Sequence, residues 1–509
     1  MTLEGQHLRL TQVELHDRTD HHNQLVHARQ WLLHPSEKQL TLQGNLFVVD
    51  DLVAGRGWVL VRAEALPHAR PQCVEHDLEV RPVPGGVSFA LFAEEGAGPW
   101  HVLDYTGGLL GRARALQQWQ RGCRPDVPGH TTPRLVVNTW GDRSRDSRMN
   151  EAFVLREIDA AARLGADVVQ LDDGWQRGTT SNSAWARQKG GVWQGFWAQD
   201  ERFWDVHPER FPRGLGPVVD HARERGVGLG LWFAPDSSDQ FANWRRDVDV
   251  LVHYHESLGV EHVKIDGVKM ISATARVNLM RFFESVLQRT GGRVVFDLDV
   301  TAETRPGYFG APGVGPLFVE NRYTDWHNWW PHHTLRNLWQ LARWVDPLRL
   351  RMEFLNPARN AEHYDGDVLA PGRWRPDALF ATVMASNPLG WFEASNLPEG
   401  FIDSVAPLVE TWKVHRQEMA SGPIVPVGEA PDGFNITGFV FVGAHRQYAL
   451  LFRQLHPDGH AQLDVSDLEL PETTFDVLSG TGRVDTRDGQ LHVQIPDDLG
   501  YVFAVTPQE

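Results

Sequence analysis

Residues 151–175 read EAFVLREIDAAARLGADVVQLDDGW, in which a helical pattern gives way to a short apolar strand. Apolar side chains of the first part, Val154, Ile158 and Ala161 among them, recur at the spacing of one helix face. VVQL (168–171) is then a continuous apolar run with two aspartates at its end, which is typical of a parallel strand covered on both sides. The segment predicts one helix–strand unit of an α/β fold.

The same alternation recurs over the middle of the chain. Further strands are predicted at LVVNTW (135–140), GLGLWF (228–233), HVKID (262–266), RVVFDLD (293–299), LFVEN (317–321), LRLRMEFL (348–355) and NPLGWFE (387–393). With VVQL this gives eight strand–helix units in about 285 residues, which fits a (β/α)8 TIM barrel with insertions. A doubly wound parallel sheet is the competing α/β layout.

Both flanks of this region have the pattern of β-sandwiches. Short apolar runs separated by Gly, Pro and Asp occur at LTLQGNLFVV (40–49), GWVLVRAEAL (57–66) and GGVSFALFAEE (85–95), and similar runs close the chain. We therefore predict three domains. They are an N-terminal β-sandwich (1–128), the (β/α)8 barrel (129–420) and a small C-terminal β-sandwich (421–509).

Composition excludes several classes of protein. The 509 residues include 66 acidic and 49 basic side chains, for a net charge of −17. This balance argues against binding to nucleic acid. No apolar run approaches the ~20 residues of a membrane span, and the N-terminus lacks a signal-peptide pattern, so we expect a cytoplasmic protein without a membrane partner. Cys73 and Cys123 are too few for a disulfide framework or a four-cysteine metal site.

Polar and aromatic residues follow almost every predicted strand, where a barrel carries its active site. The chain also has 20 Trp against 7 Tyr. Carboxylates accept hydrogen bonds from sugar hydroxyls and Trp faces pack on sugar rings, so the pattern indicates a carbohydrate ligand. The strand-end residues are Asn138, Trp140, Asp142, Asp172, Asp173, Trp175, Trp232, Asp236, Lys264, Asp266, Asp297, Asp299, Glu320, Glu353, Asn356, Trp391 and Glu393. For Asp297 and Asp299, capping of the following helix is an equal alternative.

Cleavage of a glycosidic bond needs two carboxylates, and Asp266 is the better candidate for the nucleophile. It ends the fourth predicted strand, and Lys264 lies two residues earlier on the same face of that strand. A nearby ammonium lowers the pKa of a carboxylate and keeps it ionised, as a nucleophile requires.

VVQLDDGWQ (168–176), GLWFAP (230–235) and HVKID (262–266) resemble, in sequence and in order, the α-galactosidases of glycoside hydrolase family 36, in clan D of retaining glycosidases. The resemblance covers about residues 130–415, and the flanking β-domains match that layout. It implies that Asp266 is the nucleophile, that Asp172 and Asp173 bind sugar hydroxyls and that Lys264 touches the sugar. The family usually has arginine where this chain has Lys269.

The chain departs from the family at two loops. The family's acid/base lies after the sixth strand in a serine–aspartate–x–threonine–aspartate context, which here is replaced by LFVENRYTDW (317–326). We expect Glu320 to be the acid/base because it stands directly at the strand end, with Asp325 as the alternative. After the fifth strand, the family's cysteine–serine–glycine loop contacts the sugar's 2-position. Of that loop this chain keeps only Arg305 and Gly307, so another α-hexose or a 2-substituted sugar remains open.

The sequence thus predicts a retaining exo-α-glycosidase of α-galactosidase type that acts on an α-linked oligosaccharide or glycoside without a metal or cofactor. The expected substrate-binding residues are Asp172, Asp173, Trp175, Trp232, Lys264, Arg305 and Trp140. An α-transglycosidase, an α-N-acetylgalactosaminidase or another α-hexosidase of the clan is the alternative, and an aromatic rim at Trp329 and Trp330 would favour transfer to a second sugar. From another class, a catalytically inactive carbohydrate-binding barrel is the competing hypothesis. A homo-oligomer is compatible with the sequence, which marks no interface.

Overall fold

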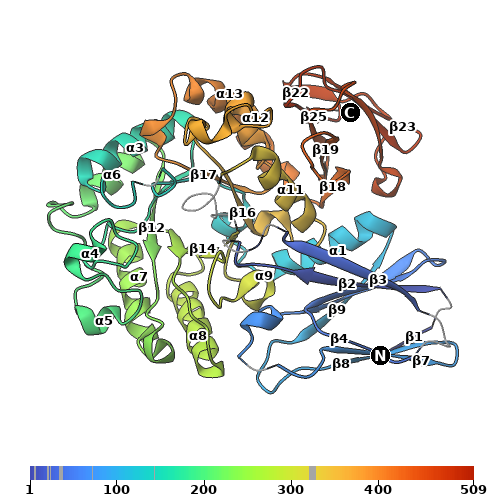
Figure 1. Ribbon diagram of the computed structural model, residues 1–509, viewed down its shortest axis with the longest axis horizontal. Coiled ribbons are helices and arrows are strands. Elements are labelled where there is room, and N and C mark those ends of the chain that lie inside the picture. Colours follow the sequence, from blue (N-terminus) through green and yellow to red (C-terminus); the bar gives the residue numbers. More distant parts are fainter. Residues whose placement is uncertain are drawn as a thin grey trace.

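The computed structural model describes residues 1–4, 7–19, 22, 24–33, 38–71, 73–142, 144–319 and 328–508. Eight parallel strands close into a barrel in chain order, which confirms the predicted TIM barrel and excludes the doubly wound sheet (Figure 1). The strands are β10 (Val136–Asn138), β11 (Val168–Leu171), β12 (Gly228–Phe233), β13 (His262–Ile265), β14 (Val295–Asp299), β15 (Leu317–Phe318), β16 (Leu350–Phe354) and β17 (Asn387–Trp391).

The barrel strands are short and buried on both faces, as expected for parallel strands beneath a layer of helices. Register places Lys264 of β13 between Trp232 of β12 and Asp297 of β14. The residues that follow each strand therefore converge at the carboxyl end of the barrel, where the side chains of several strands can meet.

Helices cover the outside of most of the barrel. The first of them, α3 (Glu151–Leu164), begins where the side chain of Asn150 accepts a hydrogen bond from the backbone N–H of Phe153, and it ends at Gly165 in the left-handed conformation. The others are α6 (Gly216–Glu224), α7 (Trp244–Leu258), α8 (Ala273–Arg289), α11 (Pro331–Leu341), α12 (Pro376–Ala381) and α13 (Phe401–Met419).

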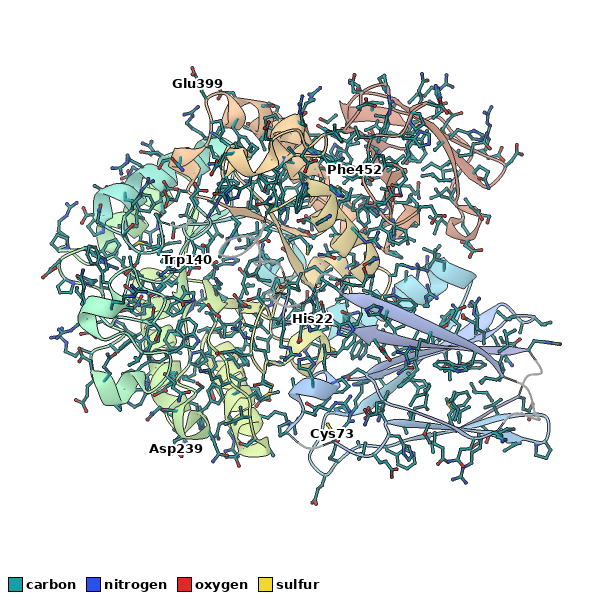
Figure 2. All side chains as sticks on the ribbon, in the orientation of Figure 1. His22, Cys73, Trp140, Asp239, Glu399 and Phe452 are labelled. Carbon is teal, nitrogen blue, oxygen red and sulfur yellow. The ribbon has the colours of Figure 1, made fainter. Side chains whose placement is uncertain are left out.

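The expectation of eight complete strand–helix units is wrong at the fifth unit. Between β14 and β15 the described chain has only the single turn α9 (Gly307–Gly310) in place of a full helix. The N-terminal sandwich packs there instead: the Tyr308 hydroxyl donates to the His16 carbonyl at 2.8 Å, and the Arg18 N–H donates to the Val300 carbonyl at 2.8 Å. Figure 2 shows His22 of the N-terminal sandwich in the region where this sandwich meets the barrel. The apolar surface that a helix would bury is thus covered by another domain.

Replacing Tyr308 with phenylalanine tests how much this contact between the barrel and the N-terminal sandwich stabilises the protein. The variant keeps the buried ring but loses the hydroxyl, so the His16 carbonyl loses a partner. We expect the free energy of unfolding to fall by about 1 kcal/mol. Denaturant unfolding of the variant and the unchanged protein measures it. Equal midpoints with equal slopes would show that the contact contributes nothing to stability.

Two sheets form the predicted N-terminal sandwich. One sheet has the order β3 (Val26–Leu33), β2 (Leu8–Leu15), β5 (Leu46–Asp51), β6 (Arg56–Arg62), β9 (Trp100–Thr106); the other has the order β1 (Thr2–Glu4), β8 (Gly86–Leu91), β7 (Leu78–Val83), β4 (Leu40–Leu42). Helix α1 (Gly108–Gly122) follows within the stretch expected to be β throughout, so that detail of the expectation is wrong. Arg121 of α1 makes two hydrogen bonds to Asp346, which fastens this helix to the barrel.

The C-terminal sandwich is also present. Its sheets have the orders β18 (Ile424–Gly428), β19 (Ile436–Val442), β20 (Gln447–Arg453), β25 (Gly500–Val505), β22 (Asp476–Gly480) and β21 (His460–Asp464), β24 (Gln490–Gln494), β23 (Arg483–Arg487). The predicted boundaries at 128 and 420 remain predictions. Across the described ranges, the helices are too short or too polar to cross a bilayer.

Candidate active site at the carboxyl end of the barrel

Asp266 stands directly after β13, and three hydrogen-bond donors hold its carboxylate. Its Oδ1 accepts from the Arg305 guanidinium at 2.9 Å and from the Gly267 N–H at 2.7 Å. Its Oδ2 accepts from the Trp232 indole at 3.3 Å. One oxygen is therefore held by two strong donors, while the other makes a single long hydrogen bond and keeps lone-pair capacity.

Lys264 lies at the centre of the site. Its Nζ donates to Asp172 Oδ2 at 3.1 Å and lies 3.7 Å from Asp299 Oδ2. Nζ also lies 4.7 Å from the centre of the Trp391 ring. Asp172 is fixed in turn by Asn138, whose amide donates to the same Oδ2 at 2.8 Å. Residues from β10, β11, β13, β14 and β17 thus meet at one point.

Arg305 and Asp299 connect the fifth loop to the nucleophile candidate. The Arg305 guanidinium donates to Asp299 Oδ1 at 2.6 Å with one terminal nitrogen and to Asp266 with the other. Asp299 also accepts from the Thr301 N–H at 2.9 Å, so it shapes the loop as well. The alternative that Asp297 and Asp299 cap a following helix is wrong, because β14 is followed by a loop; Asp299 holds that loop and binds Arg305. The Asp297 carboxylate is instead held by Arg351 at 2.8 and 3.0 Å, inside the barrel.

The charges around Asp266 favour its ionised form. Burial opposes ionisation, but the positive charges of Arg305 and Lys264, with the hydrogen bonds from Gly267 and Trp232, outweigh it and hold the pKa of Asp266 below its ordinary value. Burial and the charge of Asp266 raise the pKa of Asp299. Against the cost of burial, the surrounding carboxylates raise the pKa of Lys264, so it stays protonated.

Asp266 is more accessible than the four charged side chains that surround it most closely, although Glu303, whose carboxylate lies 3.9 Å from the Arg305 guanidinium, is 24% exposed. The Asp266 side chain is 14% exposed, against 5% for Lys264 and 3% for Arg305. The neighbouring carboxylates of Asp172 and Asp299 are exposed to 3% and 2%. Of these five side chains, Asp266 is therefore the one a ligand could reach most easily.

Asp173 is buried beside this cluster and has both oxygens occupied. Oδ1 accepts from the Gln176 amide at 2.6 Å, and Oδ2 accepts from the Thr180 hydroxyl. Burial, which outweighs these bonds, raises the pKa of Asp173 to about 7. A sugar hydroxyl would have to share one of these oxygens or replace one of these donors.

The three tryptophans expected to bind substrate occupy different depths. Trp232 is 1% exposed; its indole contacts Asp266, and its ring lies 6.1 Å from that of Trp193. Trp140 is 8% exposed at the end of β10. Trp175 has no exposed surface: its indole donates to the Trp232 carbonyl at 2.8 Å, and its ring stacks edge-on against Tyr254. The structure therefore places Trp175 in the core behind Trp232 and not at the open end of the site.

Both candidates for the acid/base, Glu320 and Asp325, lie outside the described residues. Trp329 and Trp330, the expected aromatic rim, are described. The Trp329 indole donates to the Thr334 hydroxyl at 2.9 Å, and the Trp330 indole donates to Asp367 at 2.7 Å. The Trp329 indole N–H is thus bound to the start of α11, and the Trp330 indole N–H is bound to the loop after β16.

Sequence reasoning identified Asp172, Lys264, Asp266 and Arg305, which the structure brings together. It gave no role to Trp391, whose ring faces Lys264, because a single Trp after a strand carries no distinguishing pattern. Among the described residues, no group of three or more His, Cys, Asp or Glu side chains is arranged to hold a metal ion.

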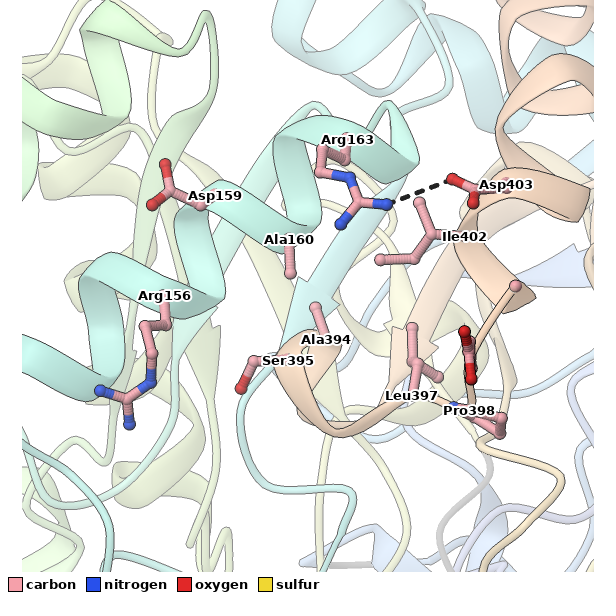
Figure 3. Close-up of a pocket in the computed structure, with 12 residues that line it drawn as sticks. Arg156, Asp159, Ala160, Arg163, Ala394, Ser395, Leu397, Pro398, Ile402 and Asp403 are labelled. Atoms are coloured by element: carbon pink, nitrogen blue, oxygen red, sulfur yellow. Dashed lines mark hydrogen bonds and ion pairs between the residues drawn. The ribbon is translucent and has the colours of Figure 1, made fainter.

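A surface groove between α3 and α13 is distinct from this cluster. Its volume is about 440 Å³, and Figure 3 shows Arg156 and Arg163 on one wall and Asp403 on the other. Arg163 and Asp403 form an exposed ion pair at 3.2 Å. None of the residues around Asp266 lines this groove, so it is not the candidate active site.

Known proteins resemble this chain in fold and over part of its sequence. No family model matches it. The α-galactosidase Mel36A of Lactobacillus acidophilus is 28% identical over 120 residues, which are 23% of this chain and 14% of that protein. α-Galactosidase 1 of Pediococcus pentosaceus is 32% identical over 143 residues, which are 27% of this chain and 17% of that protein. The matched segments are thus a small part of these relatives.

Solved structures extend the likeness to the whole chain. The GH36 α-galactosidase AgaA from Geobacillus stearothermophilus superimposes with a TM-score of 0.65 at 12% identity, and AgaB from the same organism with a TM-score of 0.67 at 14% identity. Each match covers 99% of this chain and 75% of the solved one. The chain therefore has the fold of the GH36 α-galactosidases, barrel and flanking sandwiches included, and resembles curated α-galactosidases over a segment of its sequence.

Proposed function

We propose that this protein is a retaining exo-acting α-glycosidase of α-galactosidase type, with Asp266 as its nucleophile. The observation that carries the proposal is the environment of Asp266. It is more accessible than the Asp172 and Asp299 carboxylates, and Arg305 and Lys264 favour its charged form. A carboxylate with these two properties is suited to attack an anomeric carbon at neutral pH.

The reaction follows in two displacements. In the first, Asp266 Oδ2 bonds to the anomeric carbon as the glycosidic bond breaks, and the leaving oxygen takes a proton from the acid/base. In the second, the acid/base takes a proton from water, and the water oxygen replaces Asp266 on the anomeric carbon. The two inversions restore the α-configuration. We assign the acid/base to Glu320, with Asp325 as the alternative.

The other residues of the cluster would bind and orient the sugar. Asp172 and Lys264 offer an acceptor and a donor next to Asp266, and the buried Trp232 orients Asp266 through its indole N–H. Arg305 holds the nucleophile from the side of the fifth loop. Interactions that strengthen as positive charge develops on the sugar ring would lower the barrier. The relatives and the solved neighbours are named α-galactosidases, which favours α-galactosides as the substrate class.

A panel of nitrophenyl α-glycosides tests the proposal: galactoside, glucoside and N-acetylgalactosaminide. We expect release of nitrophenol from the galactoside, with an α-configured sugar as the first product by NMR. Turnover of only the N-acetylgalactosaminide would keep the mechanism and change the sugar. Sugar transfer without hydrolysis would make the protein a transglycosidase. Absence of turnover, with sugar binding retained, would support an inactive binding barrel.

The two acid/base candidates can be separated by leaving-group dependence. Loss of the acid slows departure of a poor leaving group far more than departure of nitrophenolate, which needs no proton. For Glu320→Ala we expect activity on an α-galactosyl oligosaccharide to fall about 10²–10⁴-fold, with a much smaller loss on the nitrophenyl galactoside. Asp325→Ala should affect both substrates alike. The reverse pattern would assign the role to Asp325.

A further inference from the structure

A cavity of about 430 Å³ lies where the three domains of the chain meet. In Figure 1 the elements around it are strands β2 and β3 of the N-terminal sandwich, helix α1, helix α11 of the barrel and the start of the C-terminal sandwich after β18. None of the residues around Asp266 lines it. The cavity therefore belongs to a different part of the molecule from the candidate active site.

Two guanidinium groups line this cavity and lie within about 6 Å of the ring of the same tryptophan. The Arg112 guanidinium lies 4.6 Å from the centre of the Trp344 ring, and the Arg343 guanidinium lies 5.8 Å from it. Arg343 also lies 5.5 Å from the centre of the Trp339 ring. Both rings are buried, so they form an apolar wall beside the two guanidiniums.

The carboxylates near Arg112 and Arg343 do not neutralise them. Within the described chain, neither guanidinium has a carboxylate oxygen within 4.0 Å, and Arg112 Nε is buried without a hydrogen-bond partner. Asp50, which is close to Arg112, is instead bound by Arg9 at 2.8 Å and by the Tyr105 hydroxyl. Glu429 lines the cavity but forms no ion pair with Arg343.

The electrostatics of Arg112 agree with this geometry. Burial lowers the pKa of Arg112, and the neighbouring Tyr105 and Asp50 do not fully offset it. Arg9 is paired with Asp50, so the described wall of the cavity carries the two unpaired guanidiniums of Arg112 and Arg343 against the Glu429 carboxylate. The chain as a whole has a net charge of −17, so the excess positive charge of this cavity wall is opposite in sign to the charge of the whole protein. An anion bound there would supply the missing partner for the buried donor.

We propose that this cavity binds a small molecule through an oxyanion group, phosphate or carboxylate, with Arg112 and Arg343 as its ligands. A guanidinium presents paired N–H donors that match the oxygens of either group. The volume exceeds that of a lone phosphate and is within the range of small-molecule sites, which leaves room for a sugar-sized remainder. Because three domains contribute to the wall, the bound ligand would also hold them together.

Isothermal titration calorimetry on the full chain tests the proposal with three probes: inorganic phosphate, glucose 6-phosphate and galacturonate. Sodium chloride at matched ionic strength is the reference. We expect saturable binding of at least one probe with one site per chain. Preference for glucose 6-phosphate over phosphate would identify a sugar phosphate as the ligand class, and preference for galacturonate would identify a sugar acid.

Three variants locate the binding. Arg112→Gln and Arg343→Gln should each weaken binding about tenfold or more, since each removes a charged donor pair. Arg114→Gln is the matched control, because Arg114 is an exposed arginine on the same helix α1. If Arg112→Gln fails to fold, the exposed Arg343 still provides the test. The proposal is overturned if no probe binds more tightly than chloride, or if Arg343→Gln binds as well as Arg114→Gln.

Discussion

Turnover of α-galactosides is expected to be lost when Asp266 is replaced by alanine, with kcat falling about 10⁴-fold or more. The reason is chemical: without the carboxylate, no group is available to form the covalent intermediate with the sugar. The change leaves Arg305 and Lys264 facing an empty position next to Asp299 and Asp172, so we expect substrate binding to persist. Nitrophenol release by equal concentrations of the variant and the unchanged protein measures the effect.

A control separates chemistry from folding in this experiment. Asp249→Ala removes a carboxylate from an exposed position on α7, where its only described ion pair is with Arg289 on the surface. It should keep full activity. Thermal unfolding and circular dichroism show whether the Asp266 variant is folded. A folded Asp266 variant with activity within tenfold of the control would remove Asp266 from the reaction.

The second large effect is expected for Arg305→Gln, because Arg305 is the nearest cation to the nucleophile candidate. Its removal leaves Asp266 and Asp299 facing each other without the guanidinium that bridges them. We expect kcat to fall about 10²-fold, comparable to the loss of one donor from a preorganised site. Steady-state kinetics on the nitrophenyl galactoside would show a larger change in kcat than in KM.

Arg305→Gln should also shift the pH dependence of the reaction in one direction. In the unchanged protein Arg305 helps to hold the pKa of Asp266 below its ordinary value, so the reactive ionised form persists toward low pH. Removing Arg305 raises this pKa, and the acidic limb of kcat/KM against pH should move to higher pH. Arg223→Gln, which removes an exposed cation elsewhere, should leave the limb in place. An unmoved limb in Arg305→Gln would show that the guanidinium does not set the ionisation of the nucleophile.

The sequence predicts the cluster around Asp266 because of a simple geometric rule. In a barrel of parallel strands, residues at the carboxyl ends of different strands meet, so the positions of Asp172, Lys264 and Asp266 along the chain are enough to place them together. The alternation of apolar strands and amphipathic helices also predicts the fold. The spacing of apolar residues in a strand and in a helix is a local property of the chain, so it can be read from the sequence.

What the sequence could not predict depends on contacts between distant segments. Residues 300–316 contain three Pro and four Gly, which disfavour a helix, but they do not reveal that the N-terminal sandwich packs on that face. Trp175 is a residue type that often binds sugars, yet it is buried behind Trp232. Its burial depends on neighbours distant in sequence, such as Tyr254, which the local pattern does not reveal. The double role of Asp299, as a loop cap and as a partner of Arg305, also follows from a contact within the folded loop.

Rescue of Asp266→Ala by sodium azide tests the central claim most directly. If Asp266 forms the covalent intermediate, the alanine variant leaves room for azide to attack the same face of the anomeric carbon. We predict that azide partly restores release of nitrophenol, and that the product is a glycosyl azide of β-configuration by NMR. Restored turnover that yields an α-configured azide, or an Asp266 variant that releases free sugar as fast as the unchanged protein, would contradict the assignment of Asp266 as the nucleophile.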